Sequence, residues 1–136
     1  MSLETSRVVE VAEFREALRR FLRQSERVAR QSGLTPQRHL LLLMIKGARD
    51  GSEQSTVTEL ADRLQLAQST VTELVSRAEE IGLVERERSS EDGRIAILRL
   101  TPEGERRLAQ VFTSNERERQ ALSRAFEHLQ ATGLPT

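Results

Sequence analysis

The chain has 136 residues, with 21 basic and 21 acidic side chains, a formal net charge of zero and no cysteine. This length suits one domain with a real core, and the missing thiols exclude disulfides, zinc fingers and cysteine-based catalysis or redox sensing. No apolar run suits a signal peptide or a membrane span, so we expect a single-domain cytoplasmic protein that does not enter a membrane.

Apolar residues at spacings of three and four predict an amphipathic helix from about residue 6 to residue 31. Gly33 ends this helix, and Thr35 and Pro36 are the cap and first residue of a second helix. Residues 40–45 are apolar on every side, so we expect the second helix to be buried at the centre of the domain. The stripe on the first helix is formed by Val8, Val11, Phe14, Leu18, Phe21 and Leu22.

A polar loop over residues 47–55 precedes a short helix and a tight turn. We expect Thr58 to cap this helix with its hydroxyl, and Glu59 adds an acidic side chain to its first turn. Only residues 65–67 remain for the turn. Gln65 stands there at a position where glycine often permits a left-handed backbone.

The next predicted helix covers residues 68–81 and ends at Gly82. Beyond it the period changes to two, which predicts strands over residues 84–88 and 95–100 joined by a turn that contains Asp-Gly. The strands therefore form a hairpin directly after the helix. The buried stripe of the helix is expected to comprise Val71, Leu74, Val75, Ala78 and Ile81.

The last segment opens with Thr101 and Pro102, a cap followed by proline, and is predicted to be helical to about residue 131. The sequence leaves open whether residues 113–115 divide it into two helices. Its apolar contacts are Leu108, Val111, Phe112, Leu122, Phe126 and Leu129.

The order helix, tight turn, helix, glycine and hairpin is that of a helix-turn-helix followed by a wing. Ala61 is small where the two helices cross, which favours this interpretation over an ordinary helical hairpin. Arg94 lies near the tip of the hairpin and suits insertion into a narrow minor groove. Asp92 is placed to accept hydrogen bonds from Arg94 or from the turn backbone, although such a pair also occurs in solvated turns.

Five separated pieces of the sequence are VTELADRL at 57–64, QSTVT at 68–72, GLVER at 82–86, EDGR at 91–94 and LTPEG at 100–104. In this order and spacing they resemble the MarR family of transcriptional regulators. The resemblance implies a mainly α fold, a winged helix-turn-helix with a two-stranded β wing. It also implies a homodimer held by an N-terminal helix in residues 1–33 and C-terminal helices in residues 102–136, with residues 34–101 as the DNA-binding part.

By the same resemblance, each subunit binds half of a palindromic operator in double-stranded DNA and represses transcription until a small-molecule effector releases it. The exposed start of the recognition helix is expected to face the major groove, where glutamine can contact adenine and hydroxyls can reach bases or phosphates. Arginines further along the helix, on the strand and in the wing are expected to contact the backbone. The predicted DNA-binding residues are Gln68, Ser69, Thr70, Thr72, Arg77, Arg86, Arg88, Asp92 and Arg94.

Two residues depart from the family pattern. Glu73 stands where many members carry arginine, and a carboxylate repels phosphate although it can accept from cytosine. Ala67 replaces a frequent capping serine. Because residues 55–101 hold six arginines and nine carboxylates, affinity for DNA must depend on where the arginines are placed.

Catalysis is not expected, because the sequence has no nucleophile motif, no phosphate-binding glycine loop and no histidine pair at metal spacing. His39 and His128 stand far apart among apolar residues and are interpreted as structural or interface residues. We therefore predict no catalytic residue, metal site or cofactor. The alternative function is a winged-helix module that binds a protein and has little or no affinity for DNA.

Overall fold

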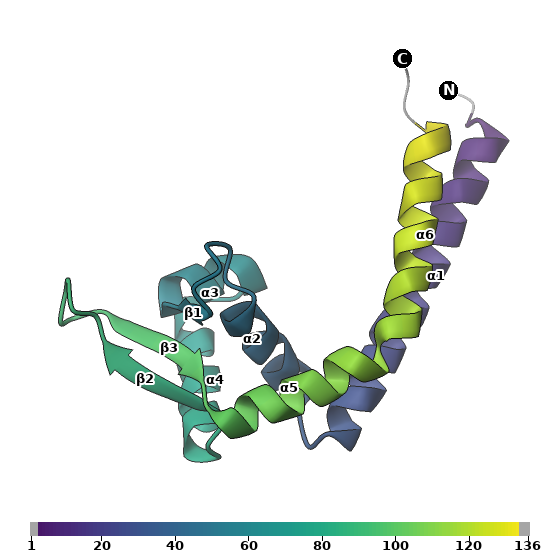
Figure 1. Ribbon diagram of the computed structural model, residues 1–136. Coiled ribbons are helices and arrows are strands. Elements are labelled where there is room, and N and C mark those ends of the chain that lie inside the picture. Colours follow the sequence, from purple (N-terminus) through teal and green to yellow (C-terminus); the bar gives the residue numbers. More distant parts are fainter. Residues whose placement is uncertain (1–2, 134–136) are drawn as a thin grey trace. The chain divides into compact units, whose positions relative to one another are not determined.

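The computed structural model describes residues 3–133, which form helices and one small sheet (Figure 1). The chain forms two compact units. The winged unit is Ala29–Gln110, and the end unit combines the residues up to Val28 with those from Val111 onward. The elements are α1 (Thr5–Gln31), α2 (Pro36–Lys46), β1 (Gln54–Ser55), α3 (Val57–Leu64), α4 (Gln68–Glu80), β2 (Val84–Arg88), β3 (Ala96–Leu100), α5 (Pro102–Ser114) and α6 (Glu116–Gly133).

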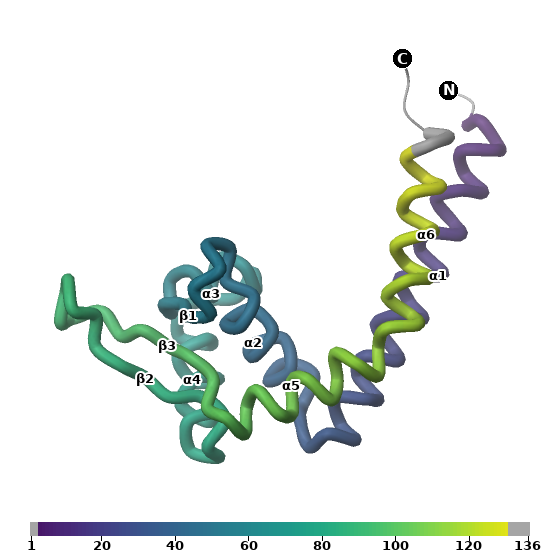
Figure 2. The backbone as a smooth tube through the Cα atoms, viewed as in Figure 1, coloured from purple at the N-terminus to yellow at the C-terminus, as the bar shows by residue number. Residues whose placement is uncertain are grey.

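In the winged unit, α2, α3 and α4 pack together beside an antiparallel sheet of order β1-β3-β2. Figure 2 shows β2 and β3 running out together as the predicted hairpin, in which Arg88 pairs with Ala96. The predicted mainly α winged fold is confirmed. The loop predicted over residues 47–55 is wrong at its end, because Gln54–Ser55 forms β1 on the free edge of β3.

The core of the winged unit comes from α2, α3, α4 and the sheet. Two predicted core positions are exposed, and Leu74 of the predicted stripe is only half-buried. Leu40 is 43% exposed because the neighbouring elements cover only part of α2, and Ile81 is 45% exposed because α4 ends at Glu80. The largest fully buried side chains of this unit are Leu41, Leu42, Ile45, Leu60, Val71, Val75, Leu83 and Leu98.

The cap of α3 lies two residues earlier than predicted, at Thr56 and not at Thr58. The Glu59 N–H donates to the Thr56 hydroxyl at 3.2 Å, and the Thr56 hydroxyl in turn lies 2.9 Å from the Glu59 carboxylate. Thr56 and Glu59 have the spacing of a capping box, but the Glu59 carboxylate accepts from the Thr56 hydroxyl. Gln65 adopts the left-handed backbone that the turn requires, with φ of 56°.

The link from β3 to α5 depends on Thr101 and, three residues later, on Gly104. The Thr101 hydroxyl donates to the Gly82 carbonyl at 2.6 Å and accepts from the Gly104 N–H at 3.0 Å. A Cβ at Gly104 would lie only 2.1 Å from the Leu83 carbonyl oxygen. Close backbone approach therefore holds the start of α5 against Gly82 and Leu83, which join α4 to β2.

In the end unit, α1 and α6 lie side by side (Figure 1), and the Phe14 and Phe126 rings meet at a centroid distance of 5.9 Å. The C-terminal segment is two helices, because α5 ends at Ser114 and α6 begins after the buried Asn115. No helix within residues 3–133 has the length and apolar character needed to cross a bilayer. The functional division of the chain at residues 33–34 and 101–102 stays a prediction.

Candidate nucleic-acid interface

The start of α4 presents an exposed surface of uncharged polar side chains, formed by Gln68, Ser69, Thr70 and Thr72. Val71 and Val75 on the opposite side of the helix are fully buried and fix its orientation in the winged unit. The polar side chains are thus held outward by the packing of the apolar ones.

The first turn of α4 also lacks a side-chain cap. Ala67 occupies the cap position with an extended backbone, and no side chain accepts a hydrogen bond there. The first N–H groups of a helix have no partner inside the helix, and they carry the positive end of its dipole. They are consequently available to an anion such as a phosphate.

The wing turn is built around Asp92. Its carboxylate accepts a hydrogen bond from the Arg94 backbone N–H at 3.0 Å, and its own N–H donates to the Ser89 hydroxyl at 3.3 Å. The contact between the Arg94 guanidinium and the same carboxylate is long, at 3.5 Å, and the Arg94 side chain is 93% exposed. Asp92 therefore shapes the turn and leaves the Arg94 charge in solvent.

The arginines nearer the helix are paired within the chain. Arg77 binds Glu73 at 2.9 Å, one turn earlier on α4. Arg86 binds both carboxylate oxygens of Glu79, with a shortest distance of 2.6 Å, and this hydrogen bonding raises the pKa of the Arg86 guanidinium. Each arginine must give up or share its carboxylate before it can bind a phosphate.

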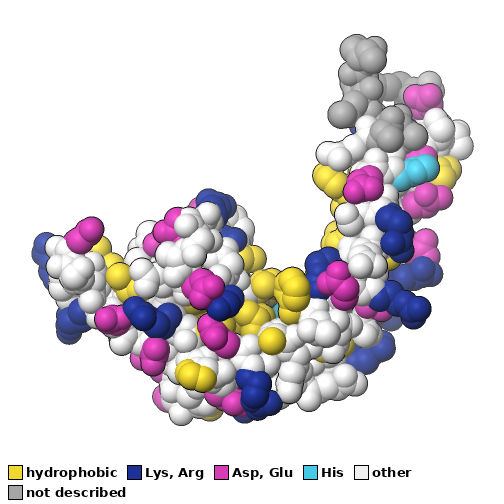
Figure 3. All heavy atoms as spheres, in the orientation of Figure 1, with side chains coloured by type: hydrophobic (Ala, Val, Ile, Leu, Met, Phe, Trp, Pro, Cys, Tyr) yellow, Lys and Arg dark blue, Asp and Glu magenta, His cyan; other side chains and the backbone are white. Residues whose placement is uncertain are grey.

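The strands of the wing repeat this arrangement. The Arg88 guanidinium donates to the Gly93 carbonyl, and Arg99 forms a short ion pair with Glu87. Figure 3 shows Lys and Arg side chains interspersed with Asp and Glu side chains over the visible face, without a continuous basic stripe. Of the nine predicted residues, the structure places four on the first turns of α4, Arg77 further along it, two on β2 and two in the wing.

A family model described as the MarR family matches residues 32–95 of this chain. A solved MepR-like protein, crystallised with pseudoligands, is 30% identical, with 75% of this chain and 78% of that chain covered and a TM-score of 0.55. The chain belongs to the MarR family. MarR-family proteins are transcriptional regulators and not enzymes.

Two further solved structures are similar to this MarR-family chain. The transcriptional regulator Tm0710 from Thermotoga maritima is 26% identical over 86% of both chains, with a TM-score of 0.66. BpsR from Bordetella bronchiseptica, whose DNA binding is regulated by 6-hydroxynicotinic acid, shares the fold at 18% identity and a TM-score of 0.61, over 79% of this chain and 74% of that chain. The comparison with curated proteins gives no match.

Sequence reasoning missed one part of the surface of this MarR-family chain. The first turn of α2 lies beside α4 and brings Arg38 to the rim of an open hollow of about 500 Å³, which Thr70, Glu73 and Arg77 also line. A signal was present in the sequence, because Arg38 stands in the first turn of the helix that Thr35 and Pro36 begin, where it is half-buried in the structure. Its closeness to α4 depends on tertiary packing that no local pattern indicates.

The two histidines belong to different units. His39 is buried in α2, and this burial lowers the pKa of its imidazole, which favours the neutral form. It stands in the core of the winged unit and not on the exposed start of α4. His128 lies on α6, where its ring nitrogen is 2.8 Å from the Glu10 carboxylate.

Proposed function

We propose that the protein is a sequence-specific DNA-binding repressor that acts in the cytoplasm as a homodimer on a palindromic operator. The observation that carries this proposal is the combination, within one winged unit, of an uncapped polar helix start and an outlying arginine with its charge in solvent. The first suits the major groove and the second suits the flanking minor groove.

In this proposal the start of α4 reads the bases. Gln68 is placed to make a bidentate contact with adenine, while Ser69, Thr70 and Thr72 contact bases or phosphates through their hydroxyls. The unpaired N–H groups that follow Ala67 bind a phosphate at the edge of the groove.

The wing supplies the electrostatic attraction. Arg94 enters the minor groove or contacts its phosphates, and Asp92 keeps the turn in the shape that aims it. Arg77, Arg86 and Arg88 contact the backbone only after exchanging their present partners for phosphate. Their contribution is therefore smaller than their number suggests.

A second copy of the chain accounts for the apolar residues that the end unit leaves in solvent. They include Val8, Val9, Val11, Leu22, Phe112 and Phe126, each between 43% and 51% exposed. When exposed apolar side chains gather on one part of a protein surface, they indicate a protein–protein interface. A two-fold dimer built on this unit presents two winged units to the two halves of a palindrome.

The proposed effector is a small molecule that competes with DNA. BpsR provides the precedent of ligand-regulated DNA binding on this fold. In the present chain the hollow beside α4 has the volume of a small-ligand site, and a ligand there contacts Thr70, Glu73 and Arg77 on the recognition helix.

A protein-binding module is the second candidate, and one observation favours it. Because carboxylates pair with Arg77, Arg86 and Arg99, much of the positive charge of the winged unit is neutralised within the chain. The salt dependence of binding separates the two functions, since phosphate binding releases counterions and protein binding does so to a much smaller extent.

Selection of bound duplexes from random DNA, combined with sedimentation of the free protein, tests the proposal. We expect a palindromic consensus and a dimer that binds one duplex. Recovery of duplexes without a common sequence from a chain that sediments as a monomer would overturn it.

A further inference from the structure

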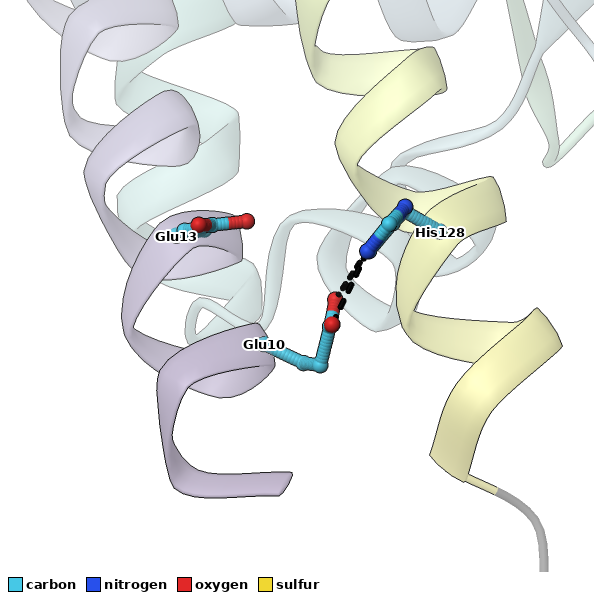
Figure 4. A group of neighbouring side chains, drawn as sticks. All are labelled: Glu10, Glu13 and His128. Carbon is cyan, nitrogen blue, oxygen red and sulfur yellow. Dashed lines mark hydrogen bonds and ion pairs between the residues drawn. The ribbon is translucent and has the colours of Figure 1, made fainter. Parts of the chain in front are cut away.

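Glu10, Glu13 and His128 bring one imidazole and two carboxylates together at the far end of the paired helices α1 and α6 (Figure 4). One ligand atom from each residue can be chosen so that all three lie within 4.8 Å of one another. The two glutamates are three residues apart on α1 and therefore share a face of the helix, while the histidine comes from α6. The cluster lies wholly within the end unit.

The carboxylates of this cluster face an imidazole and not a lysine or arginine of the described residues. The Glu10 side chain is only 14% exposed, and its carboxylate oxygens both lie 2.8 Å from the His128 ring nitrogen Nε2. Within residues 3–133, no arginine or lysine forms an ion pair with Glu10 or Glu13. The site thus combines an imidazole with two carboxylates, and the Glu10 carboxylate is largely removed from water; such a donor set favours binding of a divalent cation.

We propose that Glu10, Glu13 and His128 bind a divalent transition-metal ion of the zinc class, with water completing its coordination. Zinc binds histidine nitrogen and carboxylate oxygen at about 2.0–2.2 Å, which places tetrahedral ligands about 3.4 Å apart. The Glu10 and His128 atoms must separate slightly from their hydrogen-bonded distance to admit the ion. The exposed Glu13 side chain closes the remaining gap by a rotamer change.

The donor set argues against calcium or magnesium. These ions prefer ligand sets made of oxygen alone, whereas an imidazole nitrogen beside two carboxylates suits zinc and its neighbours in the transition series. Bound there, the ion joins residues 118 positions apart in the chain and fastens the first turns of α1 to α6. The site is complete within one chain and does not rest on the proposed DNA-binding function.

Titration of the metal-free full-length protein with zinc chloride against a chromogenic chelator tests the site. We expect one ion per chain, and an affinity that falls about tenfold or more in Glu13→Gln, which removes one ligand and leaves the Glu10–His128 hydrogen bond intact. Glu16→Gln is the matched control, because Glu16 is an exposed glutamate of α1 whose partner is Arg20. Its affinity should equal that of the unchanged chain.

Nitrogen NMR of the imidazoles locates the ion, since the chain has only two histidines. Zinc should shift the ring signals of His128 and leave those of the buried His39 in place. The proposal is overturned if Glu13→Gln binds zinc as tightly as the unchanged chain, or if the His128 signals do not move. Equal competition by magnesium would also overturn it, because that result indicates attraction to surface charge alone.

Discussion

The start of α4 and the tip of the wing present different chemistry to a DNA partner in the proposed function. The start of α4 is polar but uncharged, and the arginine further along it is held by Glu73 at 2.9 Å. The wing tip instead carries Arg94, with 93% of its side chain exposed and only a 3.5 Å contact to Asp92. The helix is therefore suited to discriminate between bases, and the wing is suited to supply salt-dependent affinity.

This contrast shows why net charge is a poor guide to the interface. A neutral chain retains a usable cation where the ion pair is long and the side chain stays in solvent, as at Arg94. Arg86, by contrast, is fully engaged with Glu79 although it precedes the same wing. We therefore expect substitutions in the wing to change the salt-dependent affinity for every duplex, and substitutions at the start of α4 to change the preference between duplexes.

Arg94→Ala should have the largest effect. Removal of this wing arginine, whose side chain is 93% exposed, is expected to weaken binding about 10- to 100-fold on every duplex and to lower the salt slope by about one. Fluorescence anisotropy across a series of salt concentrations measures both quantities. Arg20→Ala removes the same charge from α1 and should change neither; an equal loss in both variants would show that only total charge matters.

Gln68→Ala should distinguish contacts with the bases from electrostatic attraction to the phosphates. Loss of a bidentate contact should weaken binding to the selected operator about tenfold and leave binding to an unrelated duplex unchanged. Competition between the two duplexes gives the ratio directly. If affinity for both duplexes fell together, the start of α4 would contact phosphates and not bases.

Glu73→Gln should strengthen binding about threefold on any duplex, because it frees Arg77 and removes a carboxylate from the recognition helix. The salt dependence should become steeper at the same time. Glu16→Gln is the matched control, since Glu16 pairs with Arg20 at the same spacing on α1, at 2.8 Å. Unchanged or weaker binding by Glu73→Gln would indicate that the carboxylate itself contacts a base.

Ala67→Ser should have the smallest effect on DNA and act mainly on the fold. A serine at the empty cap position of α4 is expected to raise the free energy of unfolding by about 1 kcal/mol. Urea unfolding followed by circular dichroism measures the change. Ala121→Ser, on the exposed surface of α6, should give a slight loss, and a gain of the same size there would show that the cap is not the cause.

Local rules predicted most of the winged unit. The Thr35 and Pro36 helix start, the hairpin and the left-handed position at Gln65 follow from spacing and turn chemistry, and each is present. The cap of α3 was misplaced because Thr56 and Thr58 both precede an acidic residue, although threonine three residues before Glu59 is the capping-box pattern. A strand of two residues such as β1 is too short to show a period.

Local spacing rules cannot predict contacts between residues that belong to different elements of the chain. Arg86 and Glu79 meet across the turn that follows α4, so no helical or strand spacing relates them. Glu10 and His128 lie 118 residues apart, and only the pairing of α1 with α6 brings them together. The predicted DNA contacts of Gln68, Arg94 and the residues between them stay predictions, because they concern a partner molecule.

Sequence-specific DNA binding is tested by anisotropy titration of the unchanged protein. The titration uses the selected palindrome and a scrambled duplex, each at low and at physiological salt. We expect a preference for the palindrome of about 1,000-fold or more at physiological salt, and affinity for both duplexes should fall steeply as salt rises. Equal affinity for the two duplexes at low salt, or no binding to either, would contradict it.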